Sequence, residues 1–385
     1  MEALLLLLLF PVVWPFAAKR IWNTSINWTE FCIQLFGVVL ITTAVWQLGI
    51  YNQTADTEVW NGQVISKDRE HGTYEESYSC NCHEVCSGSG SSRSCSEECD
   101  TCYRTHYTVD WTADTTVGDV LFDHLDSTSS SVYLTPDPHA YTICKPKEPA
   151  SIEHNYTNYV KAVPESLFHD DSSTNEYANK VPAYPRVHDF YRVNRVLLVD
   201  TYYQKAPELN TQLNEALKSL GHQKEVNIIV IITKIPDPSY RYAVERAWIG
   251  GKKNDAVLMI GVNKNDIVWV DVMTWALNTG NEMFHVKLRD DIKALGTIED
   301  PSKITQTVVS DIRKLYDRPH MKSFEYLDSQ IYPETWVVVL AIILAIGGSI
   351  GLTFVFCIYE VDDVVSAMFY EMKYKLTGKS YRRRW

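Results

Sequence analysis

The chain has 385 residues, a formal net charge of −12 and 12% aromatic residues. This length is enough for two ordinary domains. The acidic balance argues against a nucleic-acid partner, because a protein that binds phosphate backbones usually carries a basic face. The many tyrosines and tryptophans favour an ordered protein with β-strands over a disordered one.

Three segments are apolar enough to lie in a membrane. Residues 31–51 and 336–359 contain no charged side chain, and each is long enough to cross the hydrocarbon core as a helix. Residues 3–18 are shorter and contain two prolines. This first segment lacks a basic region before it and is followed by Lys19 and Arg20. We therefore expect a membrane segment, with a cleaved signal peptide as the alternative.

The basic residues beside these segments predict an orientation. Cytoplasmic flanks of membrane helices carry an excess of lysine and arginine. The tail after the last span, residues 360–385, is basic and contains Arg382, Arg383 and Arg384. We therefore expect the tail and Lys19–Arg20 in the cytoplasm, and residues 52–334 outside it. A cleaved signal would break this agreement.

Residues 52–149 are predicted to form a small β-domain. Residues 56–68 alternate with a period of two, and residues 103–116 are rich in β-branched and aromatic side chains, so both are expected to be strands. A second strand pair is expected at residues 130–135 and 139–145. A cysteine-rich stretch lies between the first two strands and would form the tip that joins them.

That stretch is compatible with two kinds of cross-link. Outside the cytoplasm, clustered cysteines are normally oxidised to disulfides, and six of them allow 15 pairings. The C-x3-C and C-x2-C spacings also suit a tetrahedral zinc site, with His83 nearby. We expect three disulfides with a structural role and different partners for Cys80 and Cys82; zinc is the alternative. The six cysteines are Cys80, Cys82, Cys86, Cys95, Cys99 and Cys102.

Residues 150–186 are polar and irregular, and we expect them to connect two domains. Residues 187–330 then alternate between helical and strand patterns. Helices are expected at residues 210–222, 238–248, 286–296 and 301–320, and strands at 226–235, 255–262 and 266–274. This order is typical of an α/β domain, with a central sheet covered by helices.

The α/β segment resembles the TPM domain family over Val187–Asp317, about a third of the chain. The most specific stretch is YAVERAWIGGKKNDAVLMIGV. It fits the family pattern at Tyr242, Ala243, Trp248, Ile249, Gly250, Lys252, Val257 and Leu258. An earlier family segment is matched by Val187, Asp189 and Leu197.

Two departures from the family pattern bear on activity. Some family members are credited with acid phosphatase activity and with calcium binding through loop carboxylates. This chain has Ala256 where the family usually has glycine. It also has Thr274–Trp275–Ala276 in place of a short glycine turn. Both departures argue against transferring the activity and the calcium site.

The cysteine-bearing half is similar to uncharacterised membrane proteins encoded by large tailed phages, which share its cysteine spacing. That resemblance spans most of the outer region and brings no established activity. We expect a location in the bacterial inner membrane, and the basic residues beside the spans place residues 52–334 in the periplasm and the tail in the cytoplasm.

A cation site at the edge of the predicted sheet is a second hypothesis about chemistry. It would gather Asp189, Asp255 and Asp271, together with Asp200 and Asp266, and calcium would be the expected ion. The alternative is that these aspartates only end strands and form turns. The sequence contains no P-loop, G-x-S-x-G, HExxH or Rossmann glycine pattern.

These observations favour a non-enzymatic membrane-anchored protein that requires no cofactor and binds another envelope protein or copies of itself. Gly347 and Gly351 in the last span form a small-x-x-x-small pair, which would place a helix–helix contact there. We therefore expect a homo-oligomer packed through its spans. The alternative function is a phosphohydrolase of the TPM type with a carboxylate site for calcium.

Overall fold

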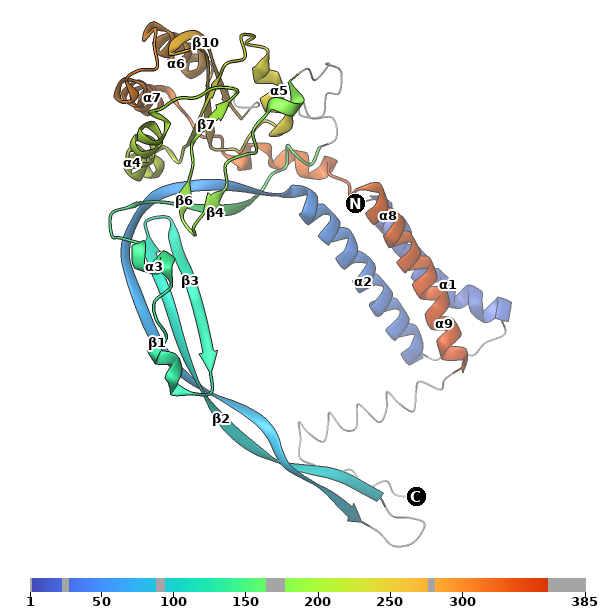
Figure 1. The fold of residues 1–385 in the computed structure, drawn as a ribbon. Coiled ribbons are helices and arrows are strands. Elements are labelled where there is room, and N and C mark those ends of the chain that lie inside the picture. Colours follow the sequence, from blue (N-terminus) through green and yellow to red (C-terminus); the bar gives the residue numbers. More distant parts are fainter. Residues whose placement is uncertain (1, 23–27, 88–93, 164–176, 276–280, 359–385) are drawn as a thin grey trace. The chain divides into compact units, whose positions relative to one another are not determined.

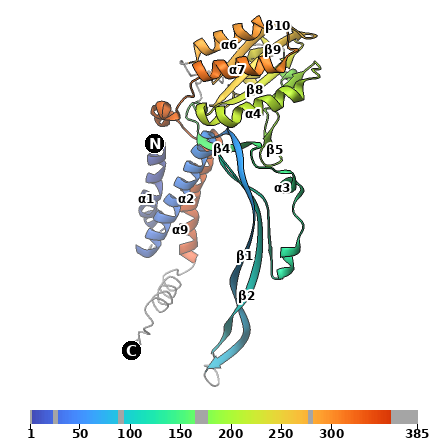
Figure 2. The same ribbon diagram turned by 90° about the vertical axis from the view of Figure 1, so that its left-hand side faces the viewer.

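A computed structural model describes residues 2–22, 28–87, 94–163, 177–275 and 281–358 (Figures 1 and 2). The predicted basic tail, residues 360–385, therefore falls outside the described residues. The chain forms two compact units. The first contains Met1–Asp56, Thr157–Ser166 and Met321–Trp385, and the second contains Thr57–Tyr156 and Leu167–His320.

The first unit is built from apolar helices. Among the described residues, two helices, Trp28–Thr54 and Thr335–Phe356, are long and apolar enough to cross a membrane. They agree with the predicted spans at 31–51 and 336–359. The elements of this unit are α1 (Glu2–Trp22), α2 (Trp28–Thr54), the 3₁₀ segment η5 (Met321–Gln330), α8 (Thr335–Ile342), the π-turn η6 (Ile343–Gly347) and α9 (Gly348–Ile358).

The first apolar segment forms part of this helix bundle. It is one helix, α1, although it contains Pro11 and Pro15. Leu4 of α1 packs with Trp46 of α2 and Ala341 of α8. Both prolines are themselves buried, whereas Val12, Val13 and Phe16 beside them are exposed.

Most of the N-terminal half of the second unit is a four-stranded sheet of order β3-β2-β1-β4. β2 pairs antiparallel with both β1 and β3. Val109, Trp111 and Ala113 of β2 are buried and alternate with residues that are not, so one face of the sheet forms a core. The strands are β1 (Ala55–Ser87), β2 (Ser94–Thr115), β3 (Gly118–Ser127) and β4 (Pro149–Thr157).

β1 and β2 continue beyond the sheet as a two-stranded ribbon. The last pair between β2 and β3 is Tyr107–Ser127, whereas β1 and β2 stay paired as far as Ser87 and Ser94. We call residues 74–87 and 94–106 the ribbon (Figures 1 and 2). None of its described side chains is buried.

Two details of the predicted β-domain are wrong. Residues 130–135 and 139–145 were expected to be strands, but they form the 3₁₀ helix η2 (Ser130–Leu134) and the short helix α3 (His139–Ile143). Pro136 and Pro138 flank them and offer no N–H for a strand ladder. β3 takes the place beside β2 instead. β4 was also unforeseen, within the expected connection at 150–186.

The C-terminal half of the second unit contains a second four-stranded sheet, of order β10-β9-β8-β7. β7, β8 and β9 run parallel, and β10 is antiparallel to β9. A small hairpin of β5 (Val187–His188) and β6 (Arg192–Val193) precedes it. The other elements are β7 (Val196–Val199), α4 (Ala206–Lys224), β8 (Asn227–Thr233), α5 (Tyr240–Ala247), β9 (Asp255–Asn263), β10 (Asp266–Thr274), α6 (Glu282–Ala294) and α7 (Pro301–Leu315).

Helices cover both faces of this second sheet. α4, α6 and α7 pack on one face through Leu217, Phe284 and Val308. α5 and Trp248 pack on the other face. All seven residues of β8 are buried, as expected for a parallel strand with both faces covered. A central sheet with flanking helices is thus confirmed as the fold of this part.

Candidate functional site

The cysteine-rich tip lies at the end of the ribbon. Cys86 is directly opposite Cys95, and a bulge interrupts the β1–β2 register between Cys80 and His83. Cys80 and Cys82 face different partners, as expected. Three cysteine pairs lie at disulfide distance, with Cα–Cα separations of 5.8 Å for Cys80–Cys102, 4.0 Å for Cys82–Cys99 and 3.9 Å for Cys86–Cys95.

Two groups at the tip could hold a metal ion instead. Cys82, Glu97 and Cys99 form one group, and Glu84, Cys86 and Cys95 form the other; within each group the ligand atoms lie within 4.8 Å of one another. The two cysteines of each group are also one of the three pairs at disulfide distance. A sulfur atom in a disulfide does not act as a thiolate ligand, so the redox state of each pair decides between the two arrangements.

The three carboxylates of the predicted cation site do not come together. Asp255 begins β9, whereas Asp271 lies in the middle of β10, opposite Met259. Four residues of strand separate the two positions, which is roughly 13 Å. Asp189 is exposed in the β5–β6 turn, where it contacts His188. Among the described residues, groups of three or more metal-ligating side chains occur only at the ribbon tip.

Asp255 is buried and surrounded by donors from the protein itself. Its carboxylate accepts hydrogen bonds from Lys252 N (2.7 Å), Asn227 Nδ2 (2.8 Å) and the Tyr184 hydroxyl (3.0 and 3.1 Å). Burial raises its pKa to about 6, against which these hydrogen bonds act. Protein groups thus use the oxygens that would otherwise hold a cation, and the arrangement is that of a structural carboxylate.

Arg195 is the fully buried cation of this region. Its guanidinium donates to Ser151 Oγ (2.8 Å), to Asn214 Oδ1 (2.8 Å) and to the side-chain oxygens of Asn61 and Asn227. Burial lowers its pKa to about 10. These acceptors come from β4, α4, β1 and β8, so one side chain joins the two sheets of the second unit. Asn227 also links Arg195 to Asp255.

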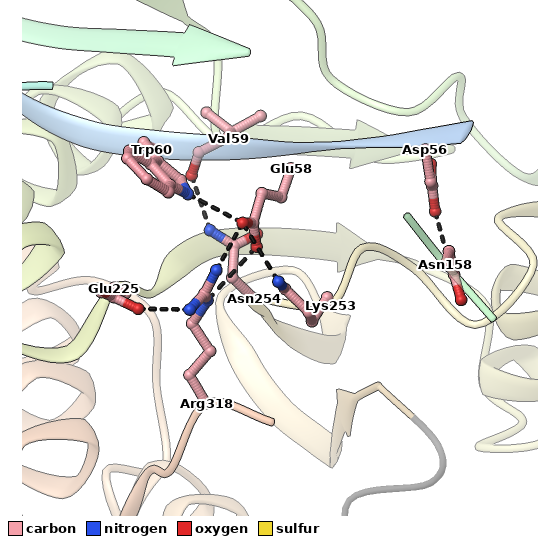
Figure 3. Close-up of polar contacts among 9 residues, drawn as sticks. All are labelled: Asp56, Glu58, Val59, Trp60, Asn158, Glu225, Lys253, Asn254 and Arg318. Atoms are coloured by element: carbon pink, nitrogen blue, oxygen red, sulfur yellow. Dashed lines mark hydrogen bonds and ion pairs between the residues drawn. The ribbon is translucent and has the colours of Figure 1, made fainter. Parts of the chain in front are cut away.

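Glu58, near the start of β1, is the centre of a buried ionic cluster (Figure 3). It is 2% exposed. Arg318 donates to both of its carboxylate oxygens, Lys253 Nζ lies 3.4 Å from Oε1, and Trp60 Nε1 donates to Oε1 at 2.9 Å. Arg318 also pairs with Glu225. The cluster thus joins the first residues of the second unit to its last residues.

A cavity of about 800 Å³ lies beside Tyr184. Its walls come from the first residues of β1, from β4, from residues 178–186 and from the loop after α5. The charged residues on the wall are Glu153, Arg186 and Lys252. Tyr184, on this wall, donates its hydroxyl to the Asp255 carboxylate.

Among the described residues, Gly347 and Gly351 of the last span make no close contact with another helix. A Cβ atom added to Gly351 would meet nothing within 4 Å, and one added to Gly347 would meet only Ile343 of its own helix. Gly49 of α2 is the glycine at a close helix contact, because a Cβ there would lie 2.6 Å from Val337. A contact of Gly347 and Gly351 with another copy stays a prediction.

Polar residues also connect parts of the first unit. Trp14 Nε1 donates to Thr353 Oγ1 at 3.1 Å, and the Thr353 hydroxyl is 3.1 Å from Gln34 Oε1, so α1, α2 and α9 share one hydrogen-bonded chain. Outside these helices, Asn158 donates to Asp56 at 2.9 Å (Figure 3).

Sequence reasoning did not find Glu58, Arg195 or Asn227. Each is a single polar residue in a strand-like segment, and their partners lie up to 260 residues away in the chain. The one local indication of a buried polar contact was Arg195 itself, a charged residue immediately before the apolar run of β7.

Comparisons of the chain with the known protein families, with curated proteins and with solved structures found no match. The resemblances to the TPM domain and to phage membrane proteins therefore stay predictions. What the chain does has to be argued from its own geometry.

Proposed function

We propose that the chain is a membrane-anchored, non-enzymatic protein whose region outside the cytoplasm binds another envelope protein or further copies of the chain. The observation that carries this proposal is the ribbon. It extends two strands well beyond the sheet without burying a single described side chain.

Ordering such a ribbon is unfavourable in free energy, and a binding function of its exposed surface would explain why it is present. An isolated pair of strands is marginally stable in water, and the ribbon has no core to offset the entropy of ordering it. Tyr103 is 67% exposed and Tyr78 is 40% exposed, and tyrosine is enriched in protein interfaces. A rigid, exposed ribbon with aromatic side chains supports a role in presenting a binding surface.

Disulfides are the proposed source of this rigidity. Each of the three cysteine pairs lies at disulfide distance, and each would contribute roughly 2–4 kcal/mol. The proposed location supports oxidation: with residues 52–334 in the periplasm of a bacterium and the tail in the cytoplasm, the tip would lie in an oxidising compartment. Zinc at the reduced cysteines is the alternative that thiol counting and elemental analysis would detect.

The helices of the first unit are the proposed anchor and oligomer contact. In the described part of α9, Gly351 leaves open space beside the helix, which a neighbouring helix could approach closely. A homo-oligomer in the bacterial inner membrane, with the α/β part a member of the TPM family, is the arrangement that we propose.

Asp255 weighs against the alternative, a TPM-type phosphohydrolase with calcium. A catalytic calcium site needs several open oxygen ligands, whereas Asp255 already accepts bonds from Lys252, Asn227 and Tyr184. Asp271 lies well along the neighbouring strand from Asp255. We therefore propose that this carboxylate stabilises the fold.

The proposal is tested by photo-cross-linking in membranes of the native host. A photoreactive residue replaces Tyr103 on the ribbon or, as the matched control, the exposed Thr211 on α4. We expect one discrete adduct for the ribbon position, with an envelope protein or a second copy, and none for the control. Equal labelling at both positions, or none at the ribbon, would contradict the proposal.

A second measurement separates binding from catalysis. The full chain in lipid nanodiscs is incubated with an aryl phosphate, with and without calcium. We expect hydrolysis at the background rate. Turnover that Asp255→Asn abolishes would establish the phosphohydrolase instead.

A further inference from the structure

The place where the ribbon leaves the sheet carries a histidine between two carboxylates. His106 is on β2, immediately beyond the last residue pair between β2 and β3. Its Nδ1 lies 2.6 Å from Asp126 Oδ1 on β3, and its Nε2 lies 3.0 Å from Glu76 Oε2 on β1. One imidazole therefore connects all three strands at this boundary.

The bond pattern at His106 fits only the charged ring. An ionised carboxylate accepts hydrogen bonds and donates none, and a neutral imidazole has a single N–H, so it can satisfy only one of the two carboxylates. The imidazolium has two N–H groups and satisfies both. Hydrogen bonds to Asp126 and then to Glu76 raise the pKa of His106, against the effect of burial.

The neighbouring groups support the same protonation state. From β1, Tyr74 stacks on the His106 ring at 4.8 Å and donates its hydroxyl to Asp126 Oδ2 at 2.6 Å. The pKa of Asp126 is lowered by this bond and by its bond to His106. His124 of β3 pairs with Asp110 of β2, and hydrogen bonding to Asp110 raises its pKa as well. His106 is 17% exposed at its side chain, so protons reach it.

We propose that protonation of His106 fastens the base of the ribbon to the sheet, so that the ribbon is held at acid pH and released as the pH rises. A histidine whose pKa is raised on folding contributes stability that is fully present below its unfolded pKa of about 6.5 and is lost as the pH rises through the folded value. The backbone ladder from Trp111 to Thr115 remains on β3, so release is local to residues 124–127 and the sheet stays folded. This inference does not depend on the proposed binding partner.

The test is hydrogen exchange of the full chain in lipid nanodiscs between pH 5.5 and 8.5, corrected for the intrinsic exchange rate. We expect the amides of residues 124–127 to lose protection across this range, by about tenfold for each unit by which pairing raises the pKa of His106. His106→Gln should weaken the dependence, because a glutamine amide does not titrate, and His106→Gln together with His124→Gln should abolish it. His83→Gln, at the ribbon tip, should keep the dependence of the unmodified protein.

Two results would overturn the proposal. One is protection of residues 124–127 that does not change with pH in the unmodified protein, or that changes equally in His106→Gln. The second is an NMR titration of ¹³C-labelled histidine in the unmodified protein that gives His106 a pKa at or below about 6.5, the value of a free histidine. This result would count even if His106→Gln fails to fold.

Discussion

The ribbon and the α/β sheet are both made of regular strands, yet they are stabilised in opposite ways. All seven residues of β8 are buried between two layers of helices. None of the described ribbon side chains is buried, and its strands are joined by cysteine pairs and by cross-strand contacts. Regular secondary structure alone therefore does not show what stabilises a region. The amount of surface that the region buries does show it.

The largest expected effect comes from removing the cysteine pairs. Replacing all six tip cysteines with serine should remove roughly 2–4 kcal/mol of stabilisation for each link, and the ribbon should become protease-sensitive. The α/β part, residues 187–320, contains no cysteine and should unfold at an unchanged temperature. Limited proteolysis with thermal unfolding of the same sample checks both; a ribbon that stays resistant would mean that cross-strand contacts suffice.

Breaking the buried ionic cluster around Glu58 of β1 should cause the next largest loss of stability. Glu58→Ala leaves Arg318 and Lys253 buried without their shared carboxylate, and the loss is expected to be about 3–5 kcal/mol of unfolding free energy. Glu225→Ala is the control, because the Glu225 side chain is 51% exposed and should cost under about 1 kcal/mol. Denaturant unfolding measures both, and equal losses would show that burial of Glu58 is unimportant.

A matched pair of apolar truncations compares the two regions directly. Leu217→Ala in the α/β core, where the side chain is 1% exposed, should destabilise by about 2–5 kcal/mol. Val85→Ala on the ribbon, where 36% is exposed, should stay within about 0.5 kcal/mol. A large effect of the ribbon variant in thermal unfolding would reveal a surface that covers Val85.

The pH dependence of the stability of the α/β part should come from a buried carboxylate, Asp255. The pKa of Asp255 is raised to about 6 by burial, so its contribution to stability is greatest below about pH 4 and is lost as the pH rises through 6. Two units correspond to about 3 kcal/mol. Thermal unfolding at pH 4.5 and 7.5 should show this loss, and Asp255→Asn should reduce it. Asp266→Asn, at the exposed first residue of β10, should leave it unchanged.

The sequence predicted those elements whose pattern is local. The run from Val226 to Ile235 is apolar because β8 is covered on both faces, and the two long helices at residues 28–54 and 335–356 are apolar enough to cross a membrane. The cysteine spacing similarly indicated a compact tip. By contrast, β3 was missed because residues 118–127 contain many charged side chains that point to its solvent face.

The polar contacts could not be predicted from the sequence. Whether Glu58 is buried depends on Arg318, and whether Arg195 is buried depends on Asn61 in another sheet. No spacing rule connects residues so far apart. The carboxylates of the predicted cation site do not come together for a related reason. The strand ends were predicted correctly, but the offset between Asp255 and Asp271 along two antiparallel strands was not considered.

The pairing of Glu58 with Arg318 has a consequence for the architecture of the gene product. Glu58 follows the first residue of the second unit, Arg318 lies two residues before its last, and the two side chains are in contact. The two ends of this unit are therefore adjacent although 260 residues separate them in the chain. A unit with adjacent ends can be exchanged or duplicated in one recombination event without moving those ends apart. A fragment from residue 57 to 320, which also carries residues 157–166 of the first unit, should accordingly fold with its termini side by side.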